Sequence, residues 1–94
     1  MHILRVEHPV ADFAAWKRSF DNDPAQRQKS GVRRYRVARA VDDPGFVTVD
    51  LEFDTLAAAE AFLKVLRGVW GRVTGTLIDA PSGRLLEMVE VKEY

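Results

Sequence analysis

Hydrophobic and polar residues alternate most clearly in residues 46–53, which read Phe-Val-Thr-Val-Asp-Leu-Glu-Phe. Polar side chains there separate the apolar side chains of Val47, Val49, Leu51 and Phe53. A period of two over eight residues predicts a β-strand with one apolar face. The β-branched and aromatic content of the stretch also favours a strand over a helix.

Shorter patterns of the same kind predict three more strands, at residues 3–8, 32–41 and 85–92. Pro9 ends the first of them, because a proline nitrogen has no hydrogen to donate to a neighbouring strand. Residues 42–45, Asp-Asp-Pro-Gly, are strong turn formers. We therefore expect the second and third strands in chain order to form a hairpin.

A first amphipathic helix is predicted after Asp12. Its apolar stripe has the spacing i, i+3, i+7 and consists of Phe13, Trp16 and Phe20. Asp23-Pro24 is expected to interrupt the helix and to start a short second helical piece, because aspartate is a good N-cap and proline suits the first helical position. This piece is predicted at residues 25–30, with Gly31 stopping it.

A second long helix is predicted after Asp54 or Thr55. Its buried stripe is expected to consist of Ala59, Phe62, Leu63 and Leu66. Gly68 is expected to end or bend this helix, with a further helical turn before Gly75. Residues 79–83 have the composition of a surface loop.

The predicted order, β-α-β-β-α-β, is that of a ferredoxin-like α+β fold in a single domain spanning residues 1–94. Two helices would cover one face of a four-stranded antiparallel sheet. The other face is mixed and polar, and either is solvated or meets another sheet. Arg34 and Arg36 can lie opposite Asp50 and Glu52 there, in cross-strand ion pairs of roughly 0.2–1 kcal/mol each.

Composition excludes several classes of function. Fourteen basic and fourteen acidic side chains give a net charge of zero, so we expect neither nucleic acid nor a membrane as partner. The arginines in residues 33–39 are better explained as a charged edge strand than as an anion site. The chain has no cysteine, which excludes disulfides and thiolate chemistry. No signal peptide or membrane span is predicted, so a cytoplasmic protein is expected.

Histidine is the usual acid, base or ligand near neutral pH, and the chain has two. His2 and His8 would lie about 20 Å apart on an extended strand, so we expect no metal site. His8 is therefore the candidate catalytic residue. Its structural alternative is a side chain that is solvated or bonds the turn that follows it.

Residues spread over nearly the whole chain resemble small dimeric α+β-barrel proteins related to the antibiotic biosynthesis monooxygenases and the stress-responsive barrel proteins. The resemblance is carried by His8, Val10, Asp12, Phe13, Trp16, Lys17, Phe20, Asp21, Val47, Thr48, Val49, Glu52, Phe53, Thr55, Leu56, Ala59 and Phe62. It implies a homodimer in which two protomers press their open sheet faces together. It also implies a ligand cleft between each sheet and its helices.

By position, the resemblance places His8 at the mouth of this cleft. Ligand-binding residues are expected to be Trp16, Phe20, Tyr35, Leu51, Phe62, Leu66 and Trp70, with Leu4, Val6 and Phe13 beside them. Each aromatic residue also has a structural interpretation, as part of the core or, for Tyr35, with its hydroxyl at the rim. The heme-degrading branch uses a histidine on the second helix, and residues 55–75 contain none. We therefore expect no cofactor.

Three functional hypotheses follow. The first is a barrel protein that binds a small apolar or aromatic molecule in the cleft. The alternative is a cofactor-free monooxygenase or isomerase of the antibiotic biosynthesis monooxygenase type, with His8 as the base and Trp70 and Tyr35 positioning the substrate. In the third, the dimer itself is the functional unit and side chains fill the cleft.

Overall fold

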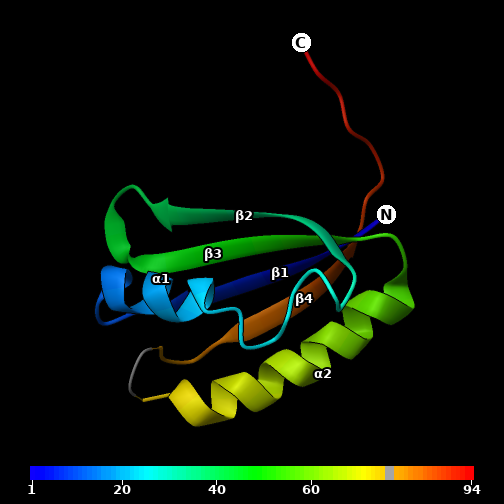
Figure 1. Cartoon of the computed structure of the whole chain (residues 1–94). Helices are drawn as coiled ribbons and strands as arrows, with labels where there is room; N and C mark the ends of the chain where they lie inside the picture. Colours follow the sequence, from blue (N-terminus) through cyan, green and yellow to red (C-terminus); the bar gives the residue numbers. More distant parts are fainter. Residues whose placement is uncertain (76–77) are drawn as a thin grey trace.

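The computed structural model describes residues 1–75 and 78–94 and has the predicted order of strands and helices (Figure 1). The elements are β1 (His2–Pro9), α1 (Phe13–Asp21), β2 (Val32–Ala40), β3 (Asp43–Phe53), α2 (Leu56–Val73) and β4 (Ser82–Glu87). The strands form one antiparallel sheet in the order β2-β3-β1-β4. The ferredoxin-like α+β fold expected from the sequence is therefore confirmed.

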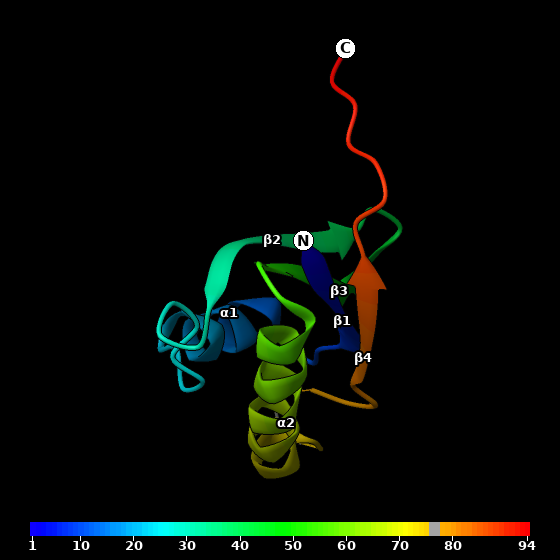
Figure 2. The ribbon, with the colours of Figure 1, turned by 90° about the vertical axis from the view of Figure 1, so that its right-hand side faces the viewer.

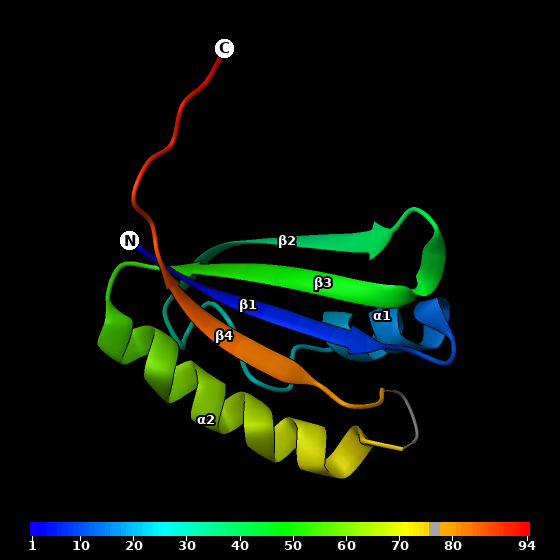
Figure 3. The same cartoon turned by 180° about the vertical axis from the view of Figure 1, so that it is seen from behind.

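Both helices lie on the same side of the sheet (Figure 2), and the view from behind shows the strands without a helix in front of them (Figure 3). Alternation along the strands decides which side chains face the helices. On the central strands these are Leu4 and Val6 of β1 and Val49 and Leu51 of β3, all at most 3% exposed. The helix-facing side of the sheet thus forms the floor of the core, as the period of two predicts.

The two helices begin where the sequence indicates. Asp12 caps α1 by accepting a hydrogen bond from the backbone N–H of Ala15, and Thr55 caps α2 in the same way through Ala58. The stripe of α2 packs onto the sheet, with Ala59, Phe62, Leu63 and Trp70 buried and Leu66 partly buried.

The helical piece predicted at residues 25–30 is absent, and the segment from Asn22 to Gly31 is a series of turns. Asp23 and Gln26 adopt left-handed backbone angles, with φ of 55° and 51°, which no right-handed helix contains. The carboxylate of Asp23 accepts a hydrogen bond from the backbone N–H of Arg27 at 2.9 Å and so stabilises the turn. The prediction was wrong because the Asp23 carboxylate, which was expected to cap a helix, stabilises a turn instead.

Gly68 neither ends nor interrupts α2, which continues to Val73 as one helix of 18 residues. A glycine inside a helix costs only about 1 kcal/mol relative to alanine, which burial of Trp70 beyond it readily offsets. The left-handed backbone suited to glycine occurs at Gly75, where φ is +87°, two residues after the helix ends.

The fourth strand was predicted at residues 85–92 but forms at Ser82–Glu87. The reason is the length of its partner: β1 begins at His2, which already pairs with Glu87. Residues after Met88 therefore have no strand of this chain beside them, and the C-terminal segment extends away from the sheet (Figures 1 and 3). The loop predicted at residues 79–83 correspondingly ends before Ser82.

The predicted hairpin of β2 and β3 is confirmed, with its turn at Val41 and Asp42. Pro44 is included in β3, where the register shift next to Ala40 tolerates a residue without an N–H.

On the open face, Arg34 donates to the buried carboxylate of Glu52 at 2.6 Å, as predicted. Asp50 instead pairs with Arg5 of β1, through Nε at 2.9 Å and Nη2 at 3.0 Å. Arg36 lies opposite Asp50 in register without a hydrogen bond to it.

Candidate functional site

A partly open cavity of about 80 Å³ lies between the helix-facing side of the sheet and the two helices. Its lining is Val6, His8, Trp16, Ser19, Phe20, Pro24, Ala25, Arg27, Val49, Leu51, Phe62, Leu66, Val69, Trp70, Val73 and Ile78. Among the described residues of this lining, the polar side chains are His8, Ser19 and Arg27. The cavity is therefore an apolar space with a few polar groups, the usual composition of a small-molecule site.

Local periodicity explains why these residues meet. Val6 and His8 are two apart on β1, as are Val49 and Leu51 on β3, so each pair points to the same face. On α2 the lining residues recur at helical spacing from Phe62 to Val73, which turns them all toward the sheet. The loop after α1 closes the remaining side.

Eight of the eleven residues that the resemblance places around the cleft line this cavity: Val6, His8, Trp16, Phe20, Leu51, Phe62, Leu66 and Trp70. Tyr35 does not. It is 40% exposed on the edge strand β2, and its ring meets the edge of Phe20 at a centroid distance of 5.2 Å. Leu4 and Phe13, expected beside the cleft, also lie outside the lining, whereas Val6 is part of it.

Aromatic rings form a continuous row along one side of the cavity. Trp16 stands edge-on to His8 at 5.6 Å and packs against Phe20 at 5.2 Å, and Phe20 in turn meets Tyr35. Such ring pairs each contribute about 0.5–1.5 kcal/mol beyond their buried area. Trp16 is thus both a core residue and a cavity wall, so the two interpretations of this residue are compatible.

His8 is buried rather than at the mouth of the cavity, with 3% of its surface exposed. Its Nδ1 lies 3.2 Å from the carbonyl oxygen of Pro9. A carbonyl only accepts, so Nδ1 carries the proton and Nε2 is the basic nitrogen of the neutral ring. Burial lowers the pKa of His8 below its usual 6.5, against the opposing effect of the Pro9 carbonyl. The hydrogen bond from His8 to the carbonyl of Pro9 agrees with the structural alternative for His8, in which its side chain bonds the turn that follows it.

Arg27 was not anticipated from the sequence, because residues 25–30 were expected to form a short helical piece and none of its side chains was predicted to face the cavity. The loop instead turns Arg27 inward, with only 13% of its side chain exposed. The guanidinium stacks over the Phe20 ring at 3.9 Å, and Nη1 donates to the carbonyl oxygen of Phe20 at 2.8 Å. No periodic pattern marks a residue placed by left-handed turns, so sequence analysis had no signal for it.

The described residues contain neither a metal-binding cluster nor a helix that could span a membrane. They contain no group of three or more histidine, cysteine or acidic side chains that could hold a metal ion. Within residues 1–75 and 78–94, neither helix is long and apolar enough to cross a membrane.

Comparison with known proteins supports the fold. No protein-family model matches the chain, and no protein of curated function matches it in sequence. Among solved structures, a "putative antibiotic biosynthesis monooxygenase" from Deinococcus radiodurans aligns with a TM-score of 0.74 and 21% identity, covering 100% of this chain and 98% of the other. A dimeric ferredoxin-like protein from an uncultured marine organism aligns with a TM-score of 0.71 and 6% identity, covering 100% of both chains.

A third similar structure is an arginine-to-serine mutant of MhuD with two manganese protoporphyrin IX molecules bound per active site. It aligns with a TM-score of 0.70 and 15% identity over 100% of both chains. One of these neighbours is described as a "putative antibiotic biosynthesis monooxygenase" and another as ferredoxin-like, in agreement with the resemblance seen in the sequence. At such identities the likeness establishes the fold, and function has to be argued from the cavity.

Proposed function

We propose that this protein binds a small, mostly apolar molecule in the cavity between sheet and helices. The observation that carries this proposal is the cavity wall, whose described residues are apolar or aromatic except for His8, Ser19 and Arg27. Burial of apolar ligand surface supplies about 25 cal/mol per Å², so such a wall favours a hydrophobic body. The polar groups would then fix its orientation.

Size limits the ligand. The cavity of about 80 Å³ is smaller than the roughly 150 Å³ of an engineered apolar cavity that holds benzene. It accepts a short aliphatic chain or the apolar end of a larger molecule, and an aromatic ring requires the walls to move apart. A porphyrin does not fit this space, and α2 carries no histidine to ligate its metal. We therefore do not extend the porphyrin binding of MhuD to this chain.

The test uses the two tryptophans of the chain, Trp16 and Trp70, both of which line the cavity. Their fluorescence and the thermal midpoint would be followed with phenol, indole and 1-hexanol. Val69→Phe places a ring in the wall and should weaken binding at least about tenfold, whereas Val65→Phe, on the same helix and outside the lining, should not. Equal binding by both variants, or no response to any compound, would refute the proposal.

A second candidate function is proton abstraction from a bound substrate by His8, as in a cofactor-free isomerase or monooxygenase. Its support is the tautomer: Nδ1 is held by the Pro9 carbonyl, and Nε2 has no hydrogen-bond partner among the described residues. Tyr35 lies outside the cavity and has no part in this proposal. His8→Gln should abolish turnover of any substrate found and leave its binding within a few-fold. Unchanged turnover would remove His8 from the chemistry.

We also propose that two copies pair through their open sheet faces. The helices leave this face uncovered, and Val89 and Val91 in the C-terminal segment are 89% and 72% exposed. One of the similar structures is described as dimeric. Native mass spectrometry at micromolar concentration should give twice the mass of the chain, and a monomer throughout would contradict the pairing.

A further inference from the structure

The apolar cavity is adjacent to a second, polar hollow. This groove has a volume of about 430 Å³ and is lined by Asp23, Arg27, Gln28, Val32, Arg33, Arg34 and Tyr35. Arg27 is the one described residue that lines both spaces. Its guanidinium therefore stands at the boundary between an apolar space and a groove with three arginines and one aspartate.

The guanidinium of Arg27 is only partly satisfied by the protein. Nη1 donates to the Phe20 carbonyl oxygen at 2.8 Å and lies 3.5 Å from the carboxylate of Asp23. That carboxylate oxygen already accepts the backbone N–H of Arg27. Nε and Nη2 have no acceptor among the residues that the structure describes. Both donors are accessible to solvent, and so to the polar end of a ligand, since neither is among the buried side-chain atoms without a partner.

Nε and Nη2 form the edge of a guanidinium that binds a carboxylate through two parallel hydrogen bonds. The chain itself contains an example: Arg5 holds Asp50 with these same two nitrogens, at 2.9 and 3.0 Å. The rings of Phe20 and Tyr35, 3.9 and 4.9 Å from the guanidinium carbon, hold the Arg27 plane in place. The edge formed by Nε and Nη2 therefore belongs to a guanidinium whose position is held by these two rings.

We propose that the ligand of this cavity is an apolar carboxylic acid, with its carboxylate bound by Nε and Nη2 of Arg27 and its hydrocarbon part in the cavity. This inference rests on the proposed binding function and specifies its ligand class. The described lining of the apolar cavity contains no acidic side chain, and Arg27 is its only lysine or arginine. The neighbouring carboxylate of Asp23 lines the polar groove and lies 3.5 Å from Nη1, not at the free edge. A neutral ligand of the same shape would offer the free edge of Arg27 no charge-assisted, two-pronged hydrogen bond.

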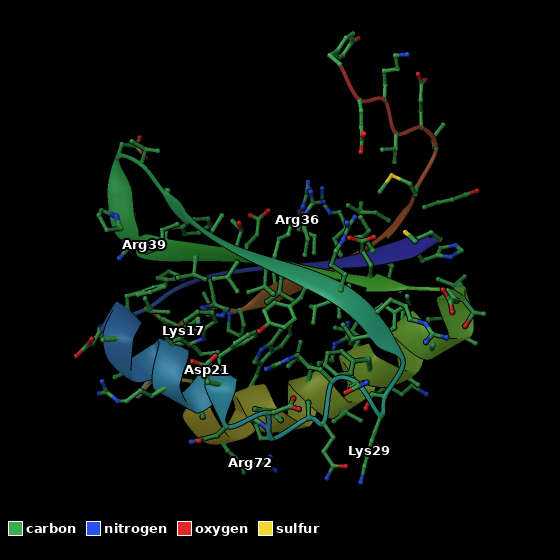
Figure 4. The ribbon with its side chains drawn as sticks, turned by 45° about the horizontal axis from the view of Figure 1, so that its top comes forward. Lys17, Asp21, Lys29, Arg36, Arg39 and Arg72 are labelled. Carbon is green, nitrogen blue, oxygen red and sulfur yellow. The ribbon has the colours of Figure 1, made fainter. Side chains whose placement is uncertain are left out.

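The experiment compares two probes of the same shape, hexanoate and hexanamide, at pH 7 by calorimetry and tryptophan fluorescence. Wild-type protein should bind hexanoate at least about tenfold more tightly than hexanamide, the difference typical of one hydrogen-bonded charge. Arg27→Gln should abolish this preference while leaving affinity for hexanamide within about threefold. The control Lys29→Gln removes the same charge from the same loop, at an exposed side chain that points away from the body of the protein (Figure 4), and should keep the preference.

The outcomes separate the two proposals. Equal wild-type affinity for hexanoate and hexanamide would overturn the carboxylate inference and leave the binding function standing. Failure of the wild type to bind these probes and the neutral compounds above would overturn both. Loss of hexanamide binding in a folded Arg27→Gln variant would show that Arg27 only shapes the loop and would also overturn the inference. If that variant does not fold, the wild-type comparison still decides.

Discussion

Gly83→Ala tests how closely α2 packs on β4. A Cβ at position 83 would lie 2.8 Å from Cδ1 of Leu63, 3.3 Å from Cη2 of Trp70 and 3.5 Å from Cδ1 of Leu4. The first distance is closer than carbon atoms approach, so Leu63 has to move. Trp70 is a rigid ring in the cavity wall and has to give by a few tenths of an ångström. The glycine is therefore needed for space.

The expected magnitude follows from two opposing effects. Overpacking a well-packed core costs typically about 1–3 kcal/mol. Alanine recovers about 0.4–1 kcal/mol by restricting the unfolded chain. The difference spans about 0–2.6 kcal/mol with a centre near 1.3 kcal/mol, and a loss of that central size lowers the thermal midpoint of a domain of this size by roughly 5–10 °C.

Urea and thermal unfolding followed by circular dichroism, at one fixed protein concentration, would measure this loss. Gly71→Ala is the matched control, because a Cβ there meets nothing within 4 Å and the residue lies inside α2. It should stabilise the protein by about 0.5–1 kcal/mol. Gly83→Ala should also shift the emission of Trp70. If both variants changed stability by the same amount and sign, close packing at Gly83 would be refuted.

Two further predictions concern pH. Burial lowers the pKa of His8, so as the pH falls below 6.5 the unfolded chain takes up a proton at this residue before the folded chain does. The free energy of unfolding should therefore fall as the pH drops from 6.5 through the lowered pKa. His8→Gln should remove this decline in pH-dependent urea unfolding and His2→Gln should not; a decline that His8→Gln leaves intact would contradict the assignment. The hydrogen bond from Arg5 lowers the pKa of Asp50 in the folded protein. The ionised carboxylate therefore stabilises the fold at pH values above the pKa that Asp50 has in the unfolded chain, and this stabilisation is lost as the pH falls through the lowered pKa. Asp50→Asn should destabilise the protein by up to about 1 kcal/mol at pH 7, with the difference from wild type vanishing in strong acid; a difference independent of pH would count against the ion pair.

Sequence patterns were sufficient to predict the fold because they depend on short-range physics. The buried faces are indicated by the period of two in β3 and by two helical stripes, Phe13-Trp16-Phe20 and Ala59-Phe62-Leu63. These patterns do not depend on which element packs against each face. Helix caps at Asp12 and Thr55 are equally local. With those faces stacked in the arrangement that the resemblance implies, eight of the eleven expected cleft residues line the cavity.

Tertiary structure decided what depends on partners distant in sequence. The start of β1 at His2 limits β4 to residues up to Glu87, whatever the pattern of residues 88–92 favours. Asp50 pairs with Arg5 because β1 flanks β3 on the side away from β2. The placement of Tyr35 outside the cavity likewise follows from the position of β2 at the edge of the sheet.

Arg27 shows this division most clearly. Its sequence neighbours predict a short helical piece, and only the left-handed residues Asp23 and Gln26 direct its guanidinium between the cavity and the polar groove. The sequence by itself determined the apolar character of the cavity, because hydrophobic periodicity is written in each element. Its polar boundary was decided by the fold, because a loop conformation and a contact between loop and helix are set by packing rather than by local pattern.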